Sequence, residues 1–195
     1  MAEEKKFTGK GTCMFGKCKY TGELRDGKRH GYGEMEFENY DLYKGDWKEG
    51  DMDGVGIYRF YDKKNDRLSD KEKYEGEFRH NVREGGGKMT YSNGDVYNGQ
   101  WQNDYRTGNG ICYFANGDVF QGLWKYDQMI RGLYRKANGE MYDGELKDGY
   151  FDGYGKYYWP NGKWFEGIFV QNKLSKGMLY TMDGKISEFK DGEQI

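Results

Sequence analysis

The chain alternates apolar and polar residues with a period of two, and glycine-containing pairs interrupt this alternation at short intervals. Tyr20, Gly22 and Leu24 occupy one set of alternate positions, and polar residues occupy the positions between them. Such an alternation is typical of a β-strand with one buried face, and the Asp26-Gly27 pair that follows is typical of a tight turn. Each segment of this kind is therefore predicted to form a β-hairpin, whose second strand here carries Gly33, Met35 and Phe37 on one face.

The same pattern recurs along most of the chain. Seven copies of an aromatic residue followed two positions later by glycine are separated by 22 or 23 residues, apart from one interval of 31 residues. This near-constant spacing indicates a tandem array in which each repeat packs on its neighbours. The aromatic residues from which the seven repeats start are Tyr20, Tyr43, Tyr74, Tyr97, Phe120, Tyr142 and Phe165.

The repeats predict an all-β protein, a single elongated, twisted antiparallel β-meander built from tandem β-hairpins. Asn-Gly pairs, as at 93–94 and 116–117, supply residues that tolerate positive φ between strands. Because glycine lies on the same face as the aromatic residue, we expect a ring from an adjacent strand to lie over the bare glycine backbone. The sheet would then have an aromatic core without a covering layer of helices.

The repeat boundaries divide the chain into three parts. We expect residues 1–19 to form a charged tail and a half-repeat cap, residues 20–186 to form the seven repeats, and residues 187–195 to form a truncated repeat or tail. The longest interval contains an insertion at 61–73 whose charges alternate in sign. Because this insertion lacks an apolar period, we expect it to extend one hairpin into solvent.

Two repeats depart from the common length. The repeats that start at Phe120 and Phe165 are one residue short, and Arg131 and Lys176 stand where glycine is expected. We expect these two repeats to kink or narrow the ribbon.

The composition supports an ordered, water-soluble chain. Leu, Ile and Val are scarce, which alone would favour disorder, but 19 Tyr, 11 Phe and 5 Trp supply apolar surface for a thin core. One third of the residues are charged, the formal net charge is −2, and no apolar stretch has the length of a membrane span. We therefore expect no nucleic-acid binding, and the charge balance disfavours binding to anionic lipid.

Cysteine usage favours a reducing compartment. The three cysteines, Cys13, Cys18 and Cys112, accompany no N-terminal apolar signal segment, so a disulfide framework is not expected. Cys112 lies in the same register as the aromatic residues and is expected to be a core thiol. We predict an intracellular, cytoplasmic protein.

Chemical motifs are weak throughout the chain. His30 and His80 lie in corresponding turn regions fifty residues apart, without a metal-ligand cluster nearby. The stretch DMDG at 51–54 lacks the other ligands of a calcium loop, and EGGGK at 84–88 lacks the flanking strand and helix of a phosphate loop. We predict no catalytic residues, no cofactor and no metal site, and therefore no enzyme.

The quoted repeats resemble the MORN repeat, whose pattern is Tyr-x-Gly-x-aromatic, then Gly-x-x-x-Gly-x-Gly, then a glycine turn. The resemblance covers about residues 9–186, and the segments YKGDWKEGDMDGVGIYRF (43–60) and YDGELKDGYFDGYGKYYWPNG (142–162) are near-complete matches. It implies a scaffold or adaptor of cytoskeletal, ciliary or flagellar assemblies. Two alternatives stay open: a module that binds phosphoinositides or membrane surfaces, and an accessory module that presents substrate to a separate enzyme.

The face opposite the glycines is polar in the first repeats and becomes apolar from the fourth repeat onward. Apolar residues on both faces of a strand indicate that both faces are covered, so we predict a partner-binding surface there, for a second copy of the chain or another protein. Twist of the sheet could also bring some of these side chains against their own neighbours. The predicted surface comprises Ile111, Tyr113, Leu123, Leu133, Tyr154, Tyr158, Ile168, Val170, Met178, Tyr180 and Met182.

A second candidate surface lies on the glycine face. Trp47, Trp101 and Trp124 occupy one position in their repeats. If their rings are partly exposed, they line a groove for a helix or an extended peptide. If they pack on neighbouring glycines, their role is structural.

Overall fold

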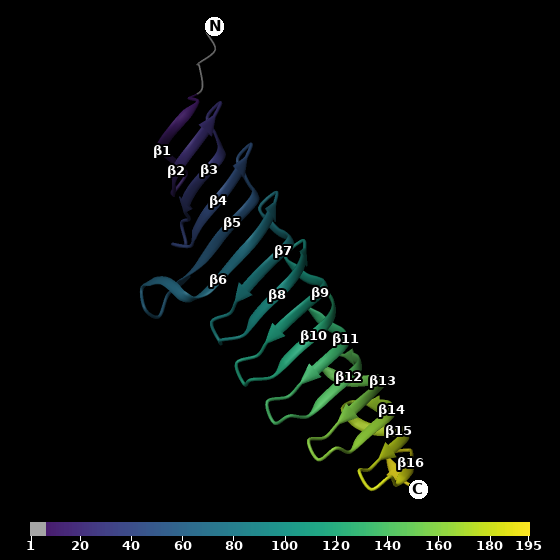
Figure 1. The fold of residues 1–195 in the computed structure, drawn as a ribbon. Coiled ribbons are helices and arrows are strands. Elements are labelled where there is room, and N and C mark those ends of the chain that lie inside the picture. The colour runs from purple at the N-terminus through teal and green to yellow at the C-terminus, as the bar shows by residue number, and fades with distance from the viewer. Residues whose placement is uncertain (1–6) are drawn as a thin grey trace. The chain divides into compact units, whose positions relative to one another are not determined.

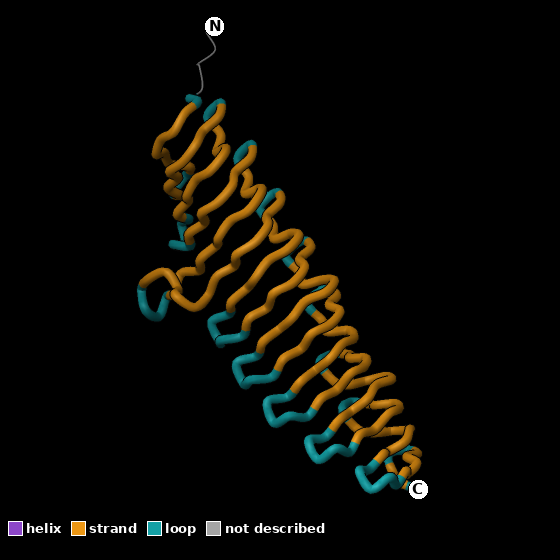
Figure 2. Tube along the Cα trace, viewed as in Figure 1, coloured by secondary structure: helices purple, strands orange, loops and turns teal. Residues whose placement is uncertain are grey.

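A computed structural model of the chain describes residues 7–195, and all of their regular elements are β-strands (Figures 1 and 2). Consecutive strands pair in antiparallel fashion, which confirms the predicted all-β meander of hairpins. The chain divides into two compact units. The first extends to Gly94 and includes Gln100–Asp104, and the second comprises Asp95–Gly99 and Tyr105–Ile195.

The first unit is an antiparallel sheet in which each strand pairs with the next along the chain. The boundary between the units passes through β8 (Val96–Gln102). The other strands of the first unit are β1 (Gly9–Phe15), β2 (Cys18–Arg25), β3 (Lys28–Glu36), β4 (Leu42–Lys48), β5 (Asp51–Asp62), β6 (Arg67–Arg79) and β7 (Val82–Thr90).

The second unit follows the same rule of pairing between consecutive strands. Its strands after β8 are β9 (Tyr105–Tyr113), β10 (Val119–Lys125), β11 (Gln128–Arg135), β12 (Met141–Lys147), β13 (Tyr150–Tyr158), β14 (Trp164–Val170), β15 (Lys173–Tyr180), β16 (Ile186–Lys190) and β17 (Glu193–Gln194).

The core consists of aromatic rings that cover pairs of glycines. Gly45 of β4 lies opposite Gly56 of β5, and the ring of Tyr43 covers both of them. A Cβ atom on Gly45 would lie 2.6 Å from the Tyr43 hydroxyl, so only glycine leaves room for the ring. All seven residues from which the repeats start are fully buried. The prediction that the ring comes from an adjacent strand was wrong for one glycine of each pair. The ring lies on the same strand as that glycine, and the other glycine of the pair lies on the adjacent strand. This follows because residues two apart on a strand share a face.

The strands of the longer repeats bend at a β-bulge just beyond the glycine pair. The register of β4 and β5 shifts between Gly45 and Trp47, so Asp46 faces three residues of β5. The middle one, Gly54, has φ +119°, a conformation that favours glycine. The Asp46 carboxylate accepts a hydrogen bond from the Val55 N–H at 2.9 Å and thereby holds the bulge.

The two shorter repeats have smaller bulges. In β10 and β11 the register shifts by one residue between Leu123 and Trp124, and the corresponding shift in β14 and β15 lies between Ile168 and Phe169. The residue that these two repeats lack is therefore one that lies in the bulge of the longer repeats. Leu123 and Ile168 stand where the longer repeats carry a polar side chain, because a one-residue bulge presents fewer N–H groups to satisfy.

The tight turns differ from the prediction in one respect. In the Asn-Gly pairs only the glycine adopts positive φ, as at Gly117 with φ +90°. Both residues have positive φ in the hairpin turns at the opposite ends of the strands, such as Asn103 and Asp104. That combination defines the two-residue turn whose twist matches paired strands.

The insertion lengthens one hairpin, since β5 and β6 continue pairing as far as Asp62 and Arg67. In β16, Phe189 pairs with Gly177 and takes the place that glycine occupies in complete repeats. Its ring packs edge-on against Phe165, with centroids 5.7 Å apart. The predicted charged tail begins in residues 1–6, which lie outside the described residues.

Candidate functional site

The three tryptophans of the glycine face are buried. Trp47, Trp101 and Trp124 are only 3%, 3% and 2% exposed. Each indole N–H donates a hydrogen bond to the carbonyl of a glycine on the neighbouring hairpin, as from Trp47 to Gly33 at 3.2 Å. A guanidinium group covers each ring, and Arg83 lies 4.3 Å from the centroid of Trp101. These rings are therefore core groups, and they do not line an exposed groove.

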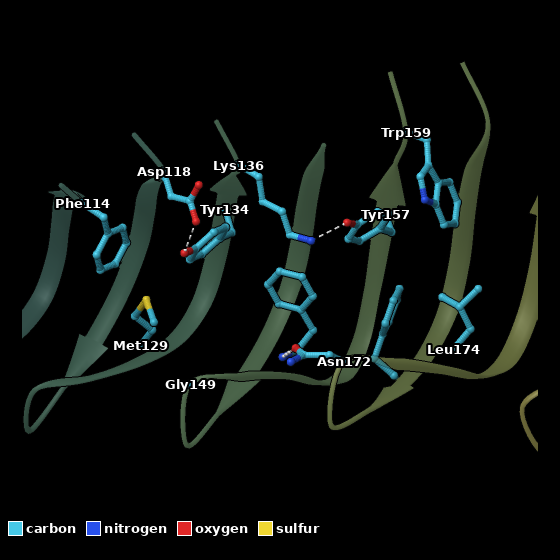
Figure 3. A pocket seen from close by; sticks show the side chains of 12 residues that line it. Phe114, Asp118, Met129, Tyr134, Lys136, Gly149, Tyr157, Trp159, Asn172 and Leu174 are labelled. Atoms are coloured by element: carbon cyan, nitrogen blue, oxygen red, sulfur yellow. Dashed lines mark hydrogen bonds between the residues drawn. The ribbon is translucent and has the colours of Figure 1, made fainter. Parts of the chain in front are cut away.

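A hollow of about 440 Å³ does open on the glycine face of the second unit (Figure 3). We call it the aromatic groove. One wall carries Tyr134 and Tyr157 from the ends of β11 and β13, with Trp159 directly after β13, and the opposite wall carries residues from the starts of the strands. The groove is lined by Phe114, Asp118, Met129, Tyr134, Lys136, Gly149, Phe151, Tyr157, Trp159, Phe169, Asn172 and Leu174.

The two walls approach each other because the strands bend at their bulges. Phe151 at the start of β13 lies 5.7 Å from the Tyr134 ring and 6.0 Å from the Tyr157 ring, measured between centroids. The groove opens here because of the residue type at the second position of the second strand in each hairpin. This position is Arg106 in β9, where the side chain covers Trp124, but Met129 in β11. Because the residue at this position is uncharged from β11 onward, no guanidinium group fills the groove.

A carboxylate lies at one edge of the aromatic groove. Asp118 accepts hydrogen bonds from the Tyr134 hydroxyl at 2.8 Å, the Ala137 N–H at 2.9 Å and the Asn116 amide at 3.1 Å. Burial alone would raise the pKa of Asp118, but these hydrogen bonds, together with the positive charge of the nearby Lys136, outweigh it and lower the pKa below its usual value. The three hydrogen-bond donors are neutral groups, so they stabilise the ionised carboxylate of Asp118 without cancelling its negative charge. This charge lies beside aromatic rings.

A lysine crosses the middle of the groove. Lys136 donates a hydrogen bond to Glu140 at 2.9 Å. It donates another to the Tyr157 hydroxyl at 2.8 Å (Figure 3). The hydrogen bond from Lys136 is the largest cause that lowers the pKa of Glu140 to about 2. Two of the three ammonium protons are thus held by Tyr157 of the groove and by Glu140 beside it.

The face opposite the glycines exposes apolar side chains in the second unit. We call the predicted set from Ile111 to Met182 the outer patch; all members except Met182, which lies in the turn after β15, are on this face of their strands. Tyr113, Leu123, Tyr154, Ile168, Val170, Met178 and Met182 are exposed, with Val170 at 50% and Met182 at 78%. Ile111, Leu133, Tyr158 and Tyr180 are half-buried.

A row of rings forms the centre of the outer patch. Tyr158 of β13 pairs with Trp164 of β14, which pairs with Tyr180 of β15. Trp164 and Tyr180 are stacked with centroids 3.8 Å apart, and Tyr158 lies 6.4 Å from Trp164. Met141 and Ile186 continue the row at either end.

The sequence interpretation missed three members of this row, Met141, Trp164 and Ile186. Each stands immediately before the first inward position of its strand, so the period-two alternation already assigned it to the outer face. The corresponding row in the first unit is mostly charged, with Lys19, Glu36, Leu42, Arg59, Lys73 and Thr90 paired in order.

The candidate chemical groups have ordinary structural surroundings. Cys112 is 1% exposed, which confirms the predicted core thiol, and burial raises its pKa to about 11. His80 lies 3.2 Å from an oxygen of Asp51. Within residues 7–195 no cluster of three or more potential metal-binding side chains was found, and no helix there is long and apolar enough to cross a membrane.

A sheet of hairpin repeats with exposed rings on one face defines a β-repeat protein. Its repeats identify the family. The chain belongs to the MORN repeat family, which matches residues 20–42, 43–64, 74–96, 97–119 and 142–164. The repeats at Phe120 and Phe165 lie outside these matches, and they are the two shortened ones.

The known proteins that resemble this chain share parts of it. Alsin of Rattus norvegicus is 37% identical over 84 residues, which cover 38% of this chain and 5% of Alsin. The chain thus corresponds to a small part of that relative. The TCP domain of Drosophila melanogaster SAS-4, solved in complex with a proline-rich motif of Ana2, gives a TM-score of 0.49 at 14% identity over 82% of this chain and 84% of that chain. The TCP10 domain of Danio rerio CPAP, solved with a STIL peptide, gives 0.44 at 14% identity over 91% and 87%.

Proposed function

We propose that the chain is a non-enzymatic scaffold or adaptor that binds a protein partner through the outer patch of its second unit. The observation that carries this proposal is the row of half-buried rings Tyr158, Trp164 and Tyr180, which lies within a patch of exposed apolar side chains. Aromatic residues and methionine are enriched in protein interfaces, where tryptophan and tyrosine often supply most of the binding free energy. The mostly charged row in the first unit is the contrasting arrangement of a solvated face.

The charges around the ring row favour a protein over an anionic membrane. Lys156 lies 5.5 Å from the Trp164 centroid, but it also forms an ion pair with Glu166 at 3.2 Å. The Tyr154 hydroxyl donates a second hydrogen bond to Glu166 at 2.6 Å. Membrane-surface binding needs an excess of basic groups, because each contributes only about 1 kcal/mol near anionic lipid. A paired, mixed-sign rim suits a protein interface better.

Membership of the MORN family supports the part of the proposal that concerns the cellular setting. We place the chain in the cytoplasm, in cytoskeletal, ciliary or flagellar assemblies. The outer patch also suits a second copy of the chain, because a two-fold dimer would bring the same surface of both copies together.

The test compares a patch variant with a variant of the equivalent row in the first unit. Proximity labelling in cells would use the wild type, the triple variant Ile168→Ser, Val170→Ser and Tyr180→Ser, and the control Leu42→Ser. We expect the triple variant to lose a defined set of labelled proteins that the control retains, with circular dichroism unchanged. Molar mass by light scattering identifies a dimer.

An unchanged set of labelled proteins in a folded triple variant would refute the outer patch as the interface. Binding of the wild type to vesicles that contain phosphoinositide, but not to neutral vesicles, would instead support the membrane alternative.

A further inference from the structure

We propose that the aromatic groove is a second binding site, for a proline-rich segment of a partner protein in the polyproline II conformation, with a basic side chain of that segment beside Asp118. This site lies on the opposite face from the outer patch, so the two proposals can fail separately. The argument rests on the spacing of the groove, on its rings and donors, and on its charge.

The spacing of the rings matches a polyproline II helix. Tyr134 and Tyr157 stand at equivalent positions of β11 and β13, two strands apart. Neighbouring strands are separated by about 4.8 Å, so equivalent rings recur at about 9.6 Å. A polyproline II helix rises about 3.1 Å per residue and makes a turn of about 9.3 Å every three residues. A ligand with proline at every third position would stay in phase with the repeats.

Other extended or helical ligands fit this spacing less well. Side chains on one face of a β-strand recur at about 6.7 Å, which does not match the ring spacing. The nearest repeat of an α-helix, seven residues, spans about 10.5 Å and drifts by about 1 Å for each repeat of the sheet. The spacing therefore favours polyproline II among the three regular conformations.

The groove supplies rings and donors of the kind that bind proline-rich peptides. The half-buried Trp159 lies with its centroid 4.8 Å from that of Tyr157, which is 8% exposed, and the two form one apolar ledge opposite the buried Phe151. Proline-rich segments dock into aromatic-lined grooves, and their preformed conformation lowers the entropy lost on binding. Their carbonyl groups need donors from the protein. Asn172 uses its amide oxygen to accept the Phe151 N–H at 2.7 Å, so its NH₂ group can serve a ligand carbonyl.

The charge of the groove selects a basic residue in the ligand. Asp118 is held by three neutral donors, and the nearby Lys136 is paired with Glu140 at 2.9 Å. A ligand arginine or lysine beside Asp118 would therefore meet a carboxylate that has no ion-pair partner in its hydrogen-bond set. The hollow of the first unit differs, because its carboxylate, Asp104, already forms an ion pair with Arg83 at 2.8 Å.

The experiment selects ligands without assuming their sequence. A display library of random twelve-residue peptides is panned on the full chain, and peptides that also bind the Trp159→Ala variant are removed. We expect the survivors to carry prolines three residues apart and one arginine or lysine. The best survivor is then measured by fluorescence anisotropy. Replacement of its prolines by alanine should weaken binding at least tenfold. Asp118→Asn should weaken binding at least threefold and remove the preference for the basic residue.

Trp164→Ala on the opposite face is the matched control and should leave the affinity unchanged. If Trp159→Ala fails to fold, nuclear magnetic resonance of the wild type decides: peptide binding should shift the Trp159 indole N–H and the Asn172 amide, and not the Trp164 indole. Survivors without spaced prolines, a library that yields no survivor, or shifts confined to the outer face would each overturn the proposal.

Discussion

The hydroxyl of Tyr43 donates a hydrogen bond to the carbonyl of Asp46, three residues further along the same strand, at 2.9 Å. The ring reaches this carbonyl because it lies across the Gly45–Gly56 pair, and the carbonyl sits at the bulge where the two strands bend. Tyr142 bonds to Glu145 in the same manner at 2.7 Å. The shortened repeats start with phenylalanine, which lacks this hydroxyl, and they have the smaller bulge.

The hydroxyl predicts a measurable contribution to stability. Tyr43→Phe should lower the free energy of unfolding by about 1 kcal/mol, because it removes the donor to a carbonyl at the buried side of the bulge. Chemical denaturation of the purified variant measures the change. Tyr32→Phe, at an exposed ring, is the control and should have almost no effect. Equal effects of the two changes would mean that the hydroxyl does not stabilise the bulge.

The glycine pairs predict a sharp difference between two adjacent positions. A Cβ atom on Gly87 would collide with the Tyr74 ring, whereas on Gly86 its nearest neighbour would be a flexible Glu77 oxygen at 3.4 Å. Gly87→Ala should therefore destabilise the fold by at least about 1–3 kcal/mol through overpacking. Gly86→Ala should be close to neutral. Thermal unfolding of both variants tests this, and a comparable loss at Gly86 would show that the ring contact does not decide the outcome.

The buried tryptophans predict a structural rather than a binding phenotype. Trp101→Ala should cost about 3–5 kcal/mol, since it removes a buried ring and its hydrogen bond to the Gly87 carbonyl at 3.1 Å. Trp164→Ala, on the outer patch, should cost no more than about 1.5 kcal/mol, the order of one aromatic stacking contact. Denaturation curves compare the two variants. A folded, stable Trp101→Ala protein would argue against a core role for this ring.

Burial of Cys112 predicts selective thiol reactivity. In the native chain at pH 8, alkylation should modify Cys13 and Cys18, which are half-buried, and spare Cys112. The raised pKa of about 11 keeps the Cys112 thiol protonated, and thiolate is the reactive form. Mass spectrometry of peptides after brief labelling gives the extent at each site, and labelling in denaturant provides the full reaction. Rapid native labelling of Cys112 would contradict the burial.

The Lys136–Glu140 pair predicts an acid-dependent term in stability. Because the folded-state pKa of Glu140 is about 2, below its ordinary value of 4.5, its ionised form stabilises the native state above pH 4.5. This contribution should disappear as the pH falls from 4.5 toward 2. The difference in denaturation midpoint between wild type and Glu140→Gln should narrow over that range. In a Lys136→Met background the same substitution should lose most of this pH dependence, and an unchanged profile would rule out the pair as its source.

The period-two alternation and the glycine spacing determined the strands, the repeat starts and the two faces. These features are local: alternation places successive side chains on opposite faces, and a bare backbone is required wherever a ring crosses it. The same rule predicted that Tyr43 is buried and that Tyr158 and Tyr180, the neighbours of Trp164 in the outer patch, point outward. It also predicted the buried thiol of Cys112.

Only the tertiary structure decided which side chains meet. Phe151 lies between Tyr134 and Tyr157 because the strands bend at bulges, and this bend brings the start of one strand toward the ends of others. Alternation also could not tell a buried Trp101 from an exposed one, since its burial depends on Arg83 from the preceding hairpin. Register and bending act between strands, so a pattern read along one strand does not contain them.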